Sequence, residues 1–179
     1  MMNFRFAMSG GPGAGKTTVL KALTEQGYLH VPESARAIIK ERLAAGLSPR
    51  PSLAQFGQDI LDRDIRYYQK TPVLDQPIFF DRGVVDSLGL LYEADVISAG
   101  DVEAYIKAFP YNKMIFLLPP WPQIYTTDDE RDQTFDEAVR VFEHLRDWYV
   151  KWGYKPVEVP RVSVDERVIF ILNTLAQIG

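Results

Sequence analysis

A glycine-rich segment near the start of the chain constrains the fold more than any other feature. It reads Gly-Gly-Pro-Gly-Ala-Gly-Lys-Thr over Gly10–Thr17 and matches the spacing G-x-x-x-x-G-K-[ST] at every fixed position. An apolar run, Phe4–Ser9, precedes this segment, and a helical pattern over Lys16–Gln26 follows it. A strand, a glycine loop and a helix in this order predict the first unit of an α/β fold with a parallel sheet.

The residue types of this loop are those that bind a chain of phosphates. Glycines let the backbone bend so that several N–H groups point into one concavity, and the next helix directs its positive dipole end there. We expect Lys16 to reach the β- and γ-phosphates of ATP, and Thr17 to ligate Mg²⁺. The expected nucleotide-binding residues of the loop are Gly10, Gly11, Pro12, Gly13, Ala14, Gly15, Lys16, Thr17 and Thr18. The alternative is a glycine-rich turn without a ligand.

The rest of the chain alternates short apolar runs with longer amphipathic patterns, as in a parallel sheet covered by helices. Further strands are expected at Tyr28–Val31, Pro77–Phe80, Lys113–Leu118 and Tyr154–Val159. Further helices are expected at Ala35–Ala45, Leu53–Tyr68, Val84–Glu93, Asp101–Phe109, Thr134–Trp152 and Asp165–Ile178. Because no linker divides these elements, we predict one α/β domain over residues 1–179. It would be a three-layer sandwich with a five-stranded parallel sheet.

Composition excludes several kinds of site and partner. The 179 residues include no cysteine, which rules out disulfides, thiolate metal sites and cysteine nucleophiles. A net charge of −4 gives no general attraction to nucleic acid or to an anionic membrane. We find neither a signal peptide nor an apolar stretch of the ~20 residues that a bilayer requires. We therefore expect a cytoplasmic protein.

The phosphate loop does not by itself identify the reaction. GTPases carry Asn-Lys-x-Asp, but the only Asn-Lys pair, Asn112-Lys113, continues with Met114 and Ile115. The transporter signature Leu-Ser-Gly-Gly does not occur in the sequence. The chain is also short for a motor or an oligomeric AAA-type machine, so these classes are disfavoured.

Five segments, taken in order, make the chain resemble the nucleoside and nucleotide kinase branch of P-loop proteins. They are Gly10–Thr18, Val31–Arg36, Phe79–Gly83, Asp128–Asp132 and Val159–Val162. Within that branch the chain looks most like small predicted ATPases related to the nicotinamide riboside kinase domain of bifunctional bacterial NAD-biosynthesis proteins. The resemblance implies strand order 2-3-1-4-5 and a helical lid at about residues 119–133.

Glu33 is the first catalytic candidate that the resemblance implies. In these kinases a carboxylate after the second strand faces the acceptor hydroxyl, and Glu33 stands two residues after Val31. Such a carboxylate could hold the hydroxyl in line with the γ-phosphate or accept its proton. Arg36, three residues later on the same helix face, could pair with Glu33 or bind a substrate anion. Alternatively, Glu33 only caps the helix.

Asp81 follows the apolar run Ile78–Phe80, the position of a Walker-B aspartate at the carboxyl edge of the sheet. We expect it to bind Mg²⁺ through water, and we expect Arg82 to bind a phosphate or to organise Glu33. The family has Asp-Arg-Ser or a similar triplet here, whereas this chain has glycine at position 83. The alternative is that Asp81 caps the next helix.

Two further arginines are candidates because of where the resemblance places the lid and the adenine. Arg131 is the one basic residue in Pro119–Asp132 and could stabilise charge on the transferred phosphoryl group, with Arg140 as a further candidate. Arg161 could stack on adenine. Alternatively, Arg131 pairs within its acidic cluster and the loop around Arg161 has no ligand.

We therefore expect an enzyme that uses ATP and Mg²⁺ to phosphorylate a hydroxyl of a small, nucleoside-like molecule. The predicted catalytic residues are Lys16, Glu33, Asp81 and Arg131, and the predicted substrate-binding residues are Glu33, Arg36 and Arg82. One alternative is a regulatory or interaction protein that binds or hydrolyses ATP without a small-molecule acceptor. Another is phosphorylation of nucleic-acid ends, which the acidic balance disfavours.

Overall fold

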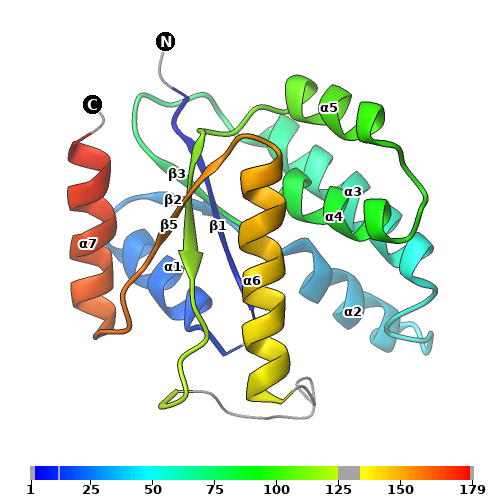
Figure 1. Cartoon of the computed structure of the whole chain (residues 1–179), viewed down its shortest axis with the longest axis horizontal. Helices are drawn as coiled ribbons and strands as arrows, with labels where there is room; N and C mark the ends of the chain where they lie inside the picture. Colours follow the sequence, from blue (N-terminus) through cyan, green and yellow to red (C-terminus); the bar gives the residue numbers. More distant parts are fainter. Residues whose placement is uncertain (1–2, 12, 125–133, 178–179) are drawn as a thin grey trace.

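Five strands form one parallel sheet in the computed structural model, which describes residues 3–11, 13–124 and 134–177. The strands are β1 (Arg5–Gly10), β2 (Leu29–Val31), β3 (Ile78–Asp81), β4 (Met114–Leu118) and β5 (Lys155–Glu158). The order across the sheet is β2-β3-β1-β4-β5, and every neighbouring pair is parallel. The predicted order 2-3-1-4-5 is thus confirmed (Figure 1).

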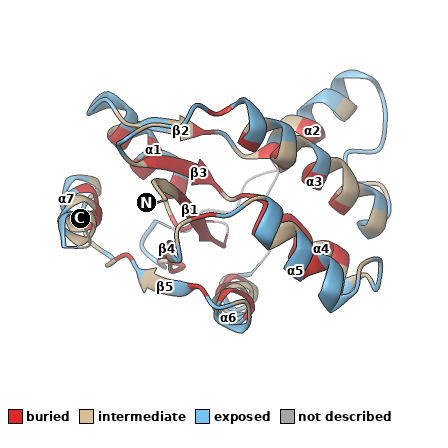
Figure 2. Cartoon of the chain, turned by 90° about the horizontal axis from the view of Figure 1, so that it is seen from above, coloured by how far each residue is buried: buried red, intermediate tan, exposed pale blue. Residues whose placement is uncertain are grey.

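The helices cover both faces of the sheet and complete the predicted three-layer sandwich (Figures 1 and 2). They are α1 (Lys16–Glu25), α2 (Ser34–Ala44), α3 (Leu53–Lys70), α4 (Val84–Glu93), α5 (Ala99–Ala108), α6 (Phe135–Lys151) and α7 (Val164–Ala176). Helices α1 and α7 pack on one face, and α3, α4 and α6 pack on the other. Each predicted element is present, with bounds that differ by two residues at most. In the described part of the chain, none of these helices is long and apolar enough to cross a bilayer.

The central strands feed two separate cores because successive side chains point to opposite faces of a sheet. In β1, Phe6 and Met8 pack against α1 and α7, whereas Ala7 belongs to the core under α3, α4 and α6. In β3, Phe79 faces the first core and Phe80 the second. Both faces are covered by helices, which explains why these strands are apolar throughout.

Hydrogen-bonded caps determine where α6 and α7 begin. The Oγ1 atom of Thr134 accepts from the Glu137 backbone N–H at 3.3 Å, and Glu137 Oε2 accepts from the Thr134 N–H at 2.6 Å. Thr134 and Glu137 thus form a capping box. Ser163 and Glu166 form the same reciprocal pair at the start of α7. Each such cap contributes about 1 kcal/mol to helix stability.

Candidate active site

The loop after β1 borders a cavity of about 1320 Å³. Gly13 and Gly15 have φ angles of 73° and 75°, which L side chains rarely adopt, so glycine is required at these two bends. The loop residues in the cavity wall are Gly11, Gly13, Ala14, Gly15, Lys16, Thr17 and Thr18. The N-terminus of α1 therefore opens on a space large enough for a nucleotide. Pro12 lies outside the described residues, and Gly10 ends β1.

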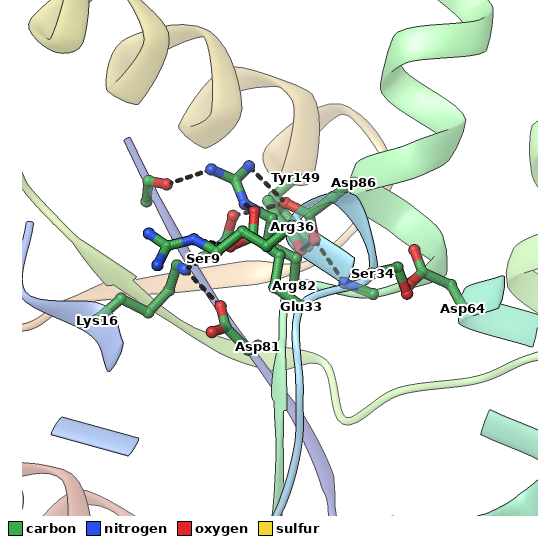
Figure 3. A network of polar contacts seen from close by, with 12 residues as sticks. Ser9, Lys16, Glu33, Ser34, Arg36, Asp64, Asp81, Arg82, Asp86 and Tyr149 are labelled. Atoms are coloured by element: carbon green, nitrogen blue, oxygen red, sulfur yellow. Dashed lines mark hydrogen bonds and ion pairs between the residues drawn. The ribbon is translucent and has the colours of Figure 1, made fainter. Parts of the chain in front are cut away.

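Lys16, in the wall of this cavity, contacts Asp81, as Figure 3 shows. The Lys16 ammonium donates a hydrogen bond to Asp81 Oδ1 and lies 4.0 Å from Glu33 Oε2. Asp81 does not supply the cap of α4, because the Gly83 N–H at the start of that helix donates to Asp86 Oδ2 at 3.0 Å. The structure thus brings together three of the predicted catalytic side chains.

Thr17 and Asp81 are the residues that would hold Mg²⁺. Thr17 is exposed in the cavity wall, and Asp81 stands at the carboxyl end of β3 beside Lys16. Magnesium in phosphate-transfer sites is usually bound by one or two carboxylates together with water and phosphate oxygens. One hydroxyl and one carboxylate fit that donor set. Among the described residues, no group of three or more His, Cys, Asp or Glu side chains could hold a metal ion.

Glu33 lies among arginines rather than capping α2. Although it occupies the N-cap position, its side chain makes no capping hydrogen bond to that helix. Arg82 Nε lies 3.2 Å from Glu33 Oε1, and Arg36 Nε lies 3.2 Å from Oε2 (Figure 3). Glu33, Arg36 and Arg82, the predicted substrate-binding residues, all line the cavity next to the phosphate loop.

Arg82 is held by backbone and side-chain contacts. Its φ of 63° is unusual for a residue other than glycine and costs of the order of 1 kcal/mol. The Arg82 backbone N–H donates to Met8 O at 2.9 Å, and its Nη2 donates to Gly10 O at 2.9 Å. Burial lowers the pKa of Arg82, but the carboxylates of Glu33 and Asp86 raise it, and the net result is a pKa above the ordinary value. The guanidinium is therefore a fixed positive charge beside the phosphate loop.

Asp86 is a residue of this site that sequence reasoning missed. Its Oδ1 accepts from Ser9 Oγ at 2.5 Å, and its Oδ2 accepts from the Tyr149 hydroxyl at 2.6 Å. Arg82 Nη1 lies 4.0 Å from Asp86 Oδ1. Asp86 therefore ties β1, α4 and α6 together beside Arg82. No local pattern marked Asp86, because its partners Ser9 and Tyr149 lie on other elements.

Gly83 departs from the family triplet for a steric reason. Its φ of 178° is ordinary extended backbone. A Cβ atom at this position would lie only 2.6 Å from the Tyr111 hydroxyl oxygen and 2.8 Å from Tyr111 Cζ. That hydroxyl accepts from the Val84 N–H at 3.3 Å, so the buried tyrosine provides the kind of acceptor that a serine side chain provides at a helix start.

A second cavity, of about 750 Å³, adjoins the first. Its wall is largely apolar and includes Leu53, Phe56, Ile60, Leu90, Leu145 and Trp148. It lies beside α3 and next to Glu33 and Arg82, which follow the carboxyl ends of β2 and β3. The residues that line both cavities are Glu33, Ala35, Arg50, Phe56 and Arg82. An apolar pocket with a few convergent polar groups is typical of a small-molecule site.

Asp64, on α3, adds a buried acid to the wall of the second cavity. Ser34 Oγ donates to Asp64 Oδ1 at 2.5 Å (Figure 3). Burial raises the pKa of Asp64 to about 7, against the opposing effect of the hydrogen bond from Ser34. No sequence pattern marks Asp64 as buried, because acids at helical spacing usually face solvent.

Arg167 and Trp121 also line the first cavity, the one next to the phosphate loop. The Arg167 guanidinium carbon is 4.6 Å from the Trp121 ring centroid, and its Nη1 donates to Ala14 O at 2.9 Å. Arg161 is exposed, and its Nε donates to Pro120 O at 2.9 Å. Arg161 does not belong to the described wall of this cavity, so its contact with adenine stays a prediction.

The predicted lid is only partly described. Trp121 and Ile124, from the first half of this segment, line the first cavity, next to the phosphate loop. Arg131 lies outside the described residues, so its catalytic role stays a prediction. Arg140, the second candidate, lies on α6 in the wall of the second cavity.

Comparison with known proteins agrees with this architecture. A family model described as an AAA domain matches residues 5–167. The chain belongs to this family. A search of curated proteins found no match.

Several solved kinases resemble this AAA-domain protein over nearly its whole length. Deoxyadenosine kinase from M. mycoides is 16% identical, with a TM-score of 0.66 over 98% of this chain and 100% of that one. Thymidylate kinase from Candida albicans is 15% identical, with a TM-score of 0.65 over 98% of this chain and 92% of that one. Thymidylate kinase from Ehrlichia chaffeensis is 12% identical, with a TM-score of 0.61 over 98% and 100%. These likenesses confirm the predicted P-loop kinase-like fold.

Proposed function

We propose that this protein is a kinase that transfers the γ-phosphoryl group of ATP to a nucleoside-like small molecule. The observation that carries the proposal is the shared wall of the two cavities, which contains Glu33 and Arg82. A donor on the phosphate loop and an acceptor in the second cavity would meet at this wall. The similar folds of a deoxyadenosine kinase and two thymidylate kinases support the same reaction class. We treat residues 1–179 as one catalytic domain that uses cytoplasmic ATP.

In this mechanism the chain positions two substrates and neutralises charge. The glycine loop and Lys16 hold the β- and γ-phosphates. Bound Mg²⁺, held by Thr17 and Asp81, would neutralise charge on the phosphate oxygens. Arg82 stabilises the charge that develops on the transferred group, because it lies between the two cavities. Glu33 fixes Arg82 and would orient a hydroxyl acceptor or take its proton.

The test is ADP formation from Mg·ATP with and without a panel of nucleosides and nucleotides. We expect one acceptor to stimulate ADP formation strongly. Lys16→Ala should lower that rate at least about 100-fold, because the phosphate charge loses its ammonium partner. Lys21→Ala is the matched control, since Lys21 is exposed on the same helix. An ATP-hydrolysing regulator would instead release ADP at the same rate with or without any acceptor.

A further inference from the structure

We propose that the acceptor carries a phosphate of its own, so that the enzyme extends a phosphate monoester instead of phosphorylating a hydroxyl. This inference rests on the proposed kinase function and narrows its substrate class. Three arginines in the wall of the second cavity carry it: Arg50, Arg82 and Arg140. The acceptor group would then differ from the hydroxyl that the sequence led us to expect.

The carboxylates in the same wall are already engaged by protein groups. The pairs are Glu33 with Arg36 and Arg82, Asp64 with Ser34, Asp86 with Ser9 and Tyr149, and Glu93 with His144. None of these contacts among the described residues involves Arg50 or Arg140.

Arg50 and Arg140 are exposed side chains that form no ion pair within the described residues. The carboxylate nearest in sequence to Arg140 is that of Glu137, one helical turn earlier, and it feels the charge of Arg140. However, Glu137 Oε2 accepts from both the N–H and the hydroxyl of Thr134, which caps α6. Two guanidinium groups thus border the cavity with their hydrogen-bonding capacity available for an anion.

Helix α6, which carries Arg140, and the side chain of Arg82 both come close to the phosphate loop. Helix α6 comes so close that a Cβ on Gly11 would be 3.2 Å from Ala138 O and 3.8 Å from Val141 Cγ1. Arg82 reaches the loop directly through its bond to the Gly10 carbonyl.

Arg50 and Arg82 line both cavities, so positive charge lies at the boundary where donor and acceptor would meet, and many of the other residues in the wall of the second cavity are apolar. The apolar wall includes Leu90, Leu145 and Trp148. Guanidinium groups bind phosphates through paired hydrogen bonds and are well suited to such a group. A neutral nucleoside would offer the exposed guanidinium groups of Arg50 and Arg140 no charge with which to pair.

The contacts of Glu33 favour the same acceptor. One of its oxygens faces Arg82 and the other faces Arg36, each at 3.2 Å. A hydroxyl acceptor needs a group that removes its proton. A phosphate monoester is largely a dianion at pH 7, because its second pKa is about 6, and its oxygen can attack without losing a proton first. Glu33 then acts as a positioning residue for the arginines.

In the reaction, an oxygen of the acceptor phosphate forms a bond to the γ-phosphorus of ATP. The bond between that phosphorus and the β–γ bridging oxygen breaks, and its electron pair leaves with ADP. The second product is the diphosphate of the acceptor, so no proton or further reactant is needed. Arg50 and Arg140 would reduce the repulsion between the two phosphates as they approach.

The first experiment compares the four ribonucleosides and four deoxynucleosides with their 5′-monophosphates as acceptors for Mg·ATP. We expect at least one monophosphate to show a kcat/KM about 10- to 100-fold above that of its parent nucleoside, the effect of a charge-assisted hydrogen bond. A nucleoside that is preferred over its monophosphate would overturn the inference and leave the kinase function intact. If no compound of either set stimulates ADP formation, the proposed function fails, and this inference fails with it.

The second experiment tests Arg140 by steady-state kinetics of Arg140→Met. We expect the KM of the monophosphate to rise about 10-fold or more while the KM of ATP stays constant, because Arg140 lines only the acceptor cavity. Arg146→Met is the matched control, since Arg146 lies on the same helix, is paired with Asp147 at 3.3 Å and lines neither cavity. An unchanged KM for the monophosphate in Arg140→Met would contradict the proposal.

Discussion

Arg82 Nε lies 3.2 Å from Glu33 Oε1, and this pair joins the end of β3 to the start of α2 at the wall between the two cavities. Neither residue is near the other in sequence. The contact therefore depends on the parallel pairing of β2 with β3, which brings the carboxyl ends of both strands to one edge. Through this contact Glu33 orients the Arg82 guanidinium group at the proposed site of phosphoryl transfer.

We expect Glu33→Gln to lower kcat about 100-fold, because the amide removes the charge that fixes Arg82 and Arg36. The KM of ATP should change little, since the phosphate loop remains intact. Steady-state kinetics with the best acceptor from the panel checks this. Glu25→Gln is the control, as Glu25 is exposed at the end of α1. A kcat equal to that of the unmodified protein would contradict the role of Glu33.

Asp64 should make the stability of the fold depend on pH. Burial raises its pKa to about 7, whereas an unfolded aspartate titrates near 3.9, so the native protein holds a proton that the unfolded chain has released. The stabilising contribution of this neutral acid is complete below about pH 4 and is lost as the pH rises through about 7.

We therefore expect Asp64→Asn to increase the free energy of unfolding at pH 8 by up to about 2–4 kcal/mol, with a smaller gain at pH 5. Urea unfolding at both pH values measures the two differences. Asp62→Asn serves as the control because Asp62 is exposed on the same helix. Equal effects of Asp64→Asn at pH 5 and pH 8 would show that Asp64 is not protonated in the native state.

Gly83→Ala should destabilise the fold by about 1–3 kcal/mol, because the added Cβ would overlap the Tyr111 side chain. The effect should be smaller in a Tyr111→Leu background, where the aromatic ring and the hydroxyl are gone. A double-mutant cycle from urea unfolding gives the coupling between the two positions. Additive effects of the two changes would exclude the steric explanation.

Features that depend on local chemistry were predictable. Glycine spacing and a following Lys-Thr identify the phosphate loop, and apolar runs followed by an acid identify the ends of buried strands such as β3. These signals identified Lys16 and Asp81, the family resemblance added Glu33, and the structure brings the three side chains together. The amphipathic patterns also gave the helix bounds to within two residues.

Features that depend on contacts between distant segments were not predictable from one sequence. Arg167 donates to Ala14 O across 153 positions, and no local pattern marks that contact. Tyr111 fills the space at Gly83, and Tyr149 holds Asp86, through packing that brings separate elements together. The roles of these residues follow from tertiary packing, which hydrophobic periodicity does not specify.

Arg82 donates hydrogen bonds to Met8 O and Gly10 O, on the strand that leads into the phosphate loop, and it also lines the second cavity. Binding of ATP beside the phosphate loop should therefore alter the affinity of the second cavity for the acceptor, and binding of the acceptor should alter the affinity for ATP. Thermodynamic linkage requires that ATP and the acceptor change each other's dissociation constants by the same factor. Calorimetric titrations of each compound, with the other absent and then saturating with a non-hydrolysable ATP analogue as the donor, would give that factor twice.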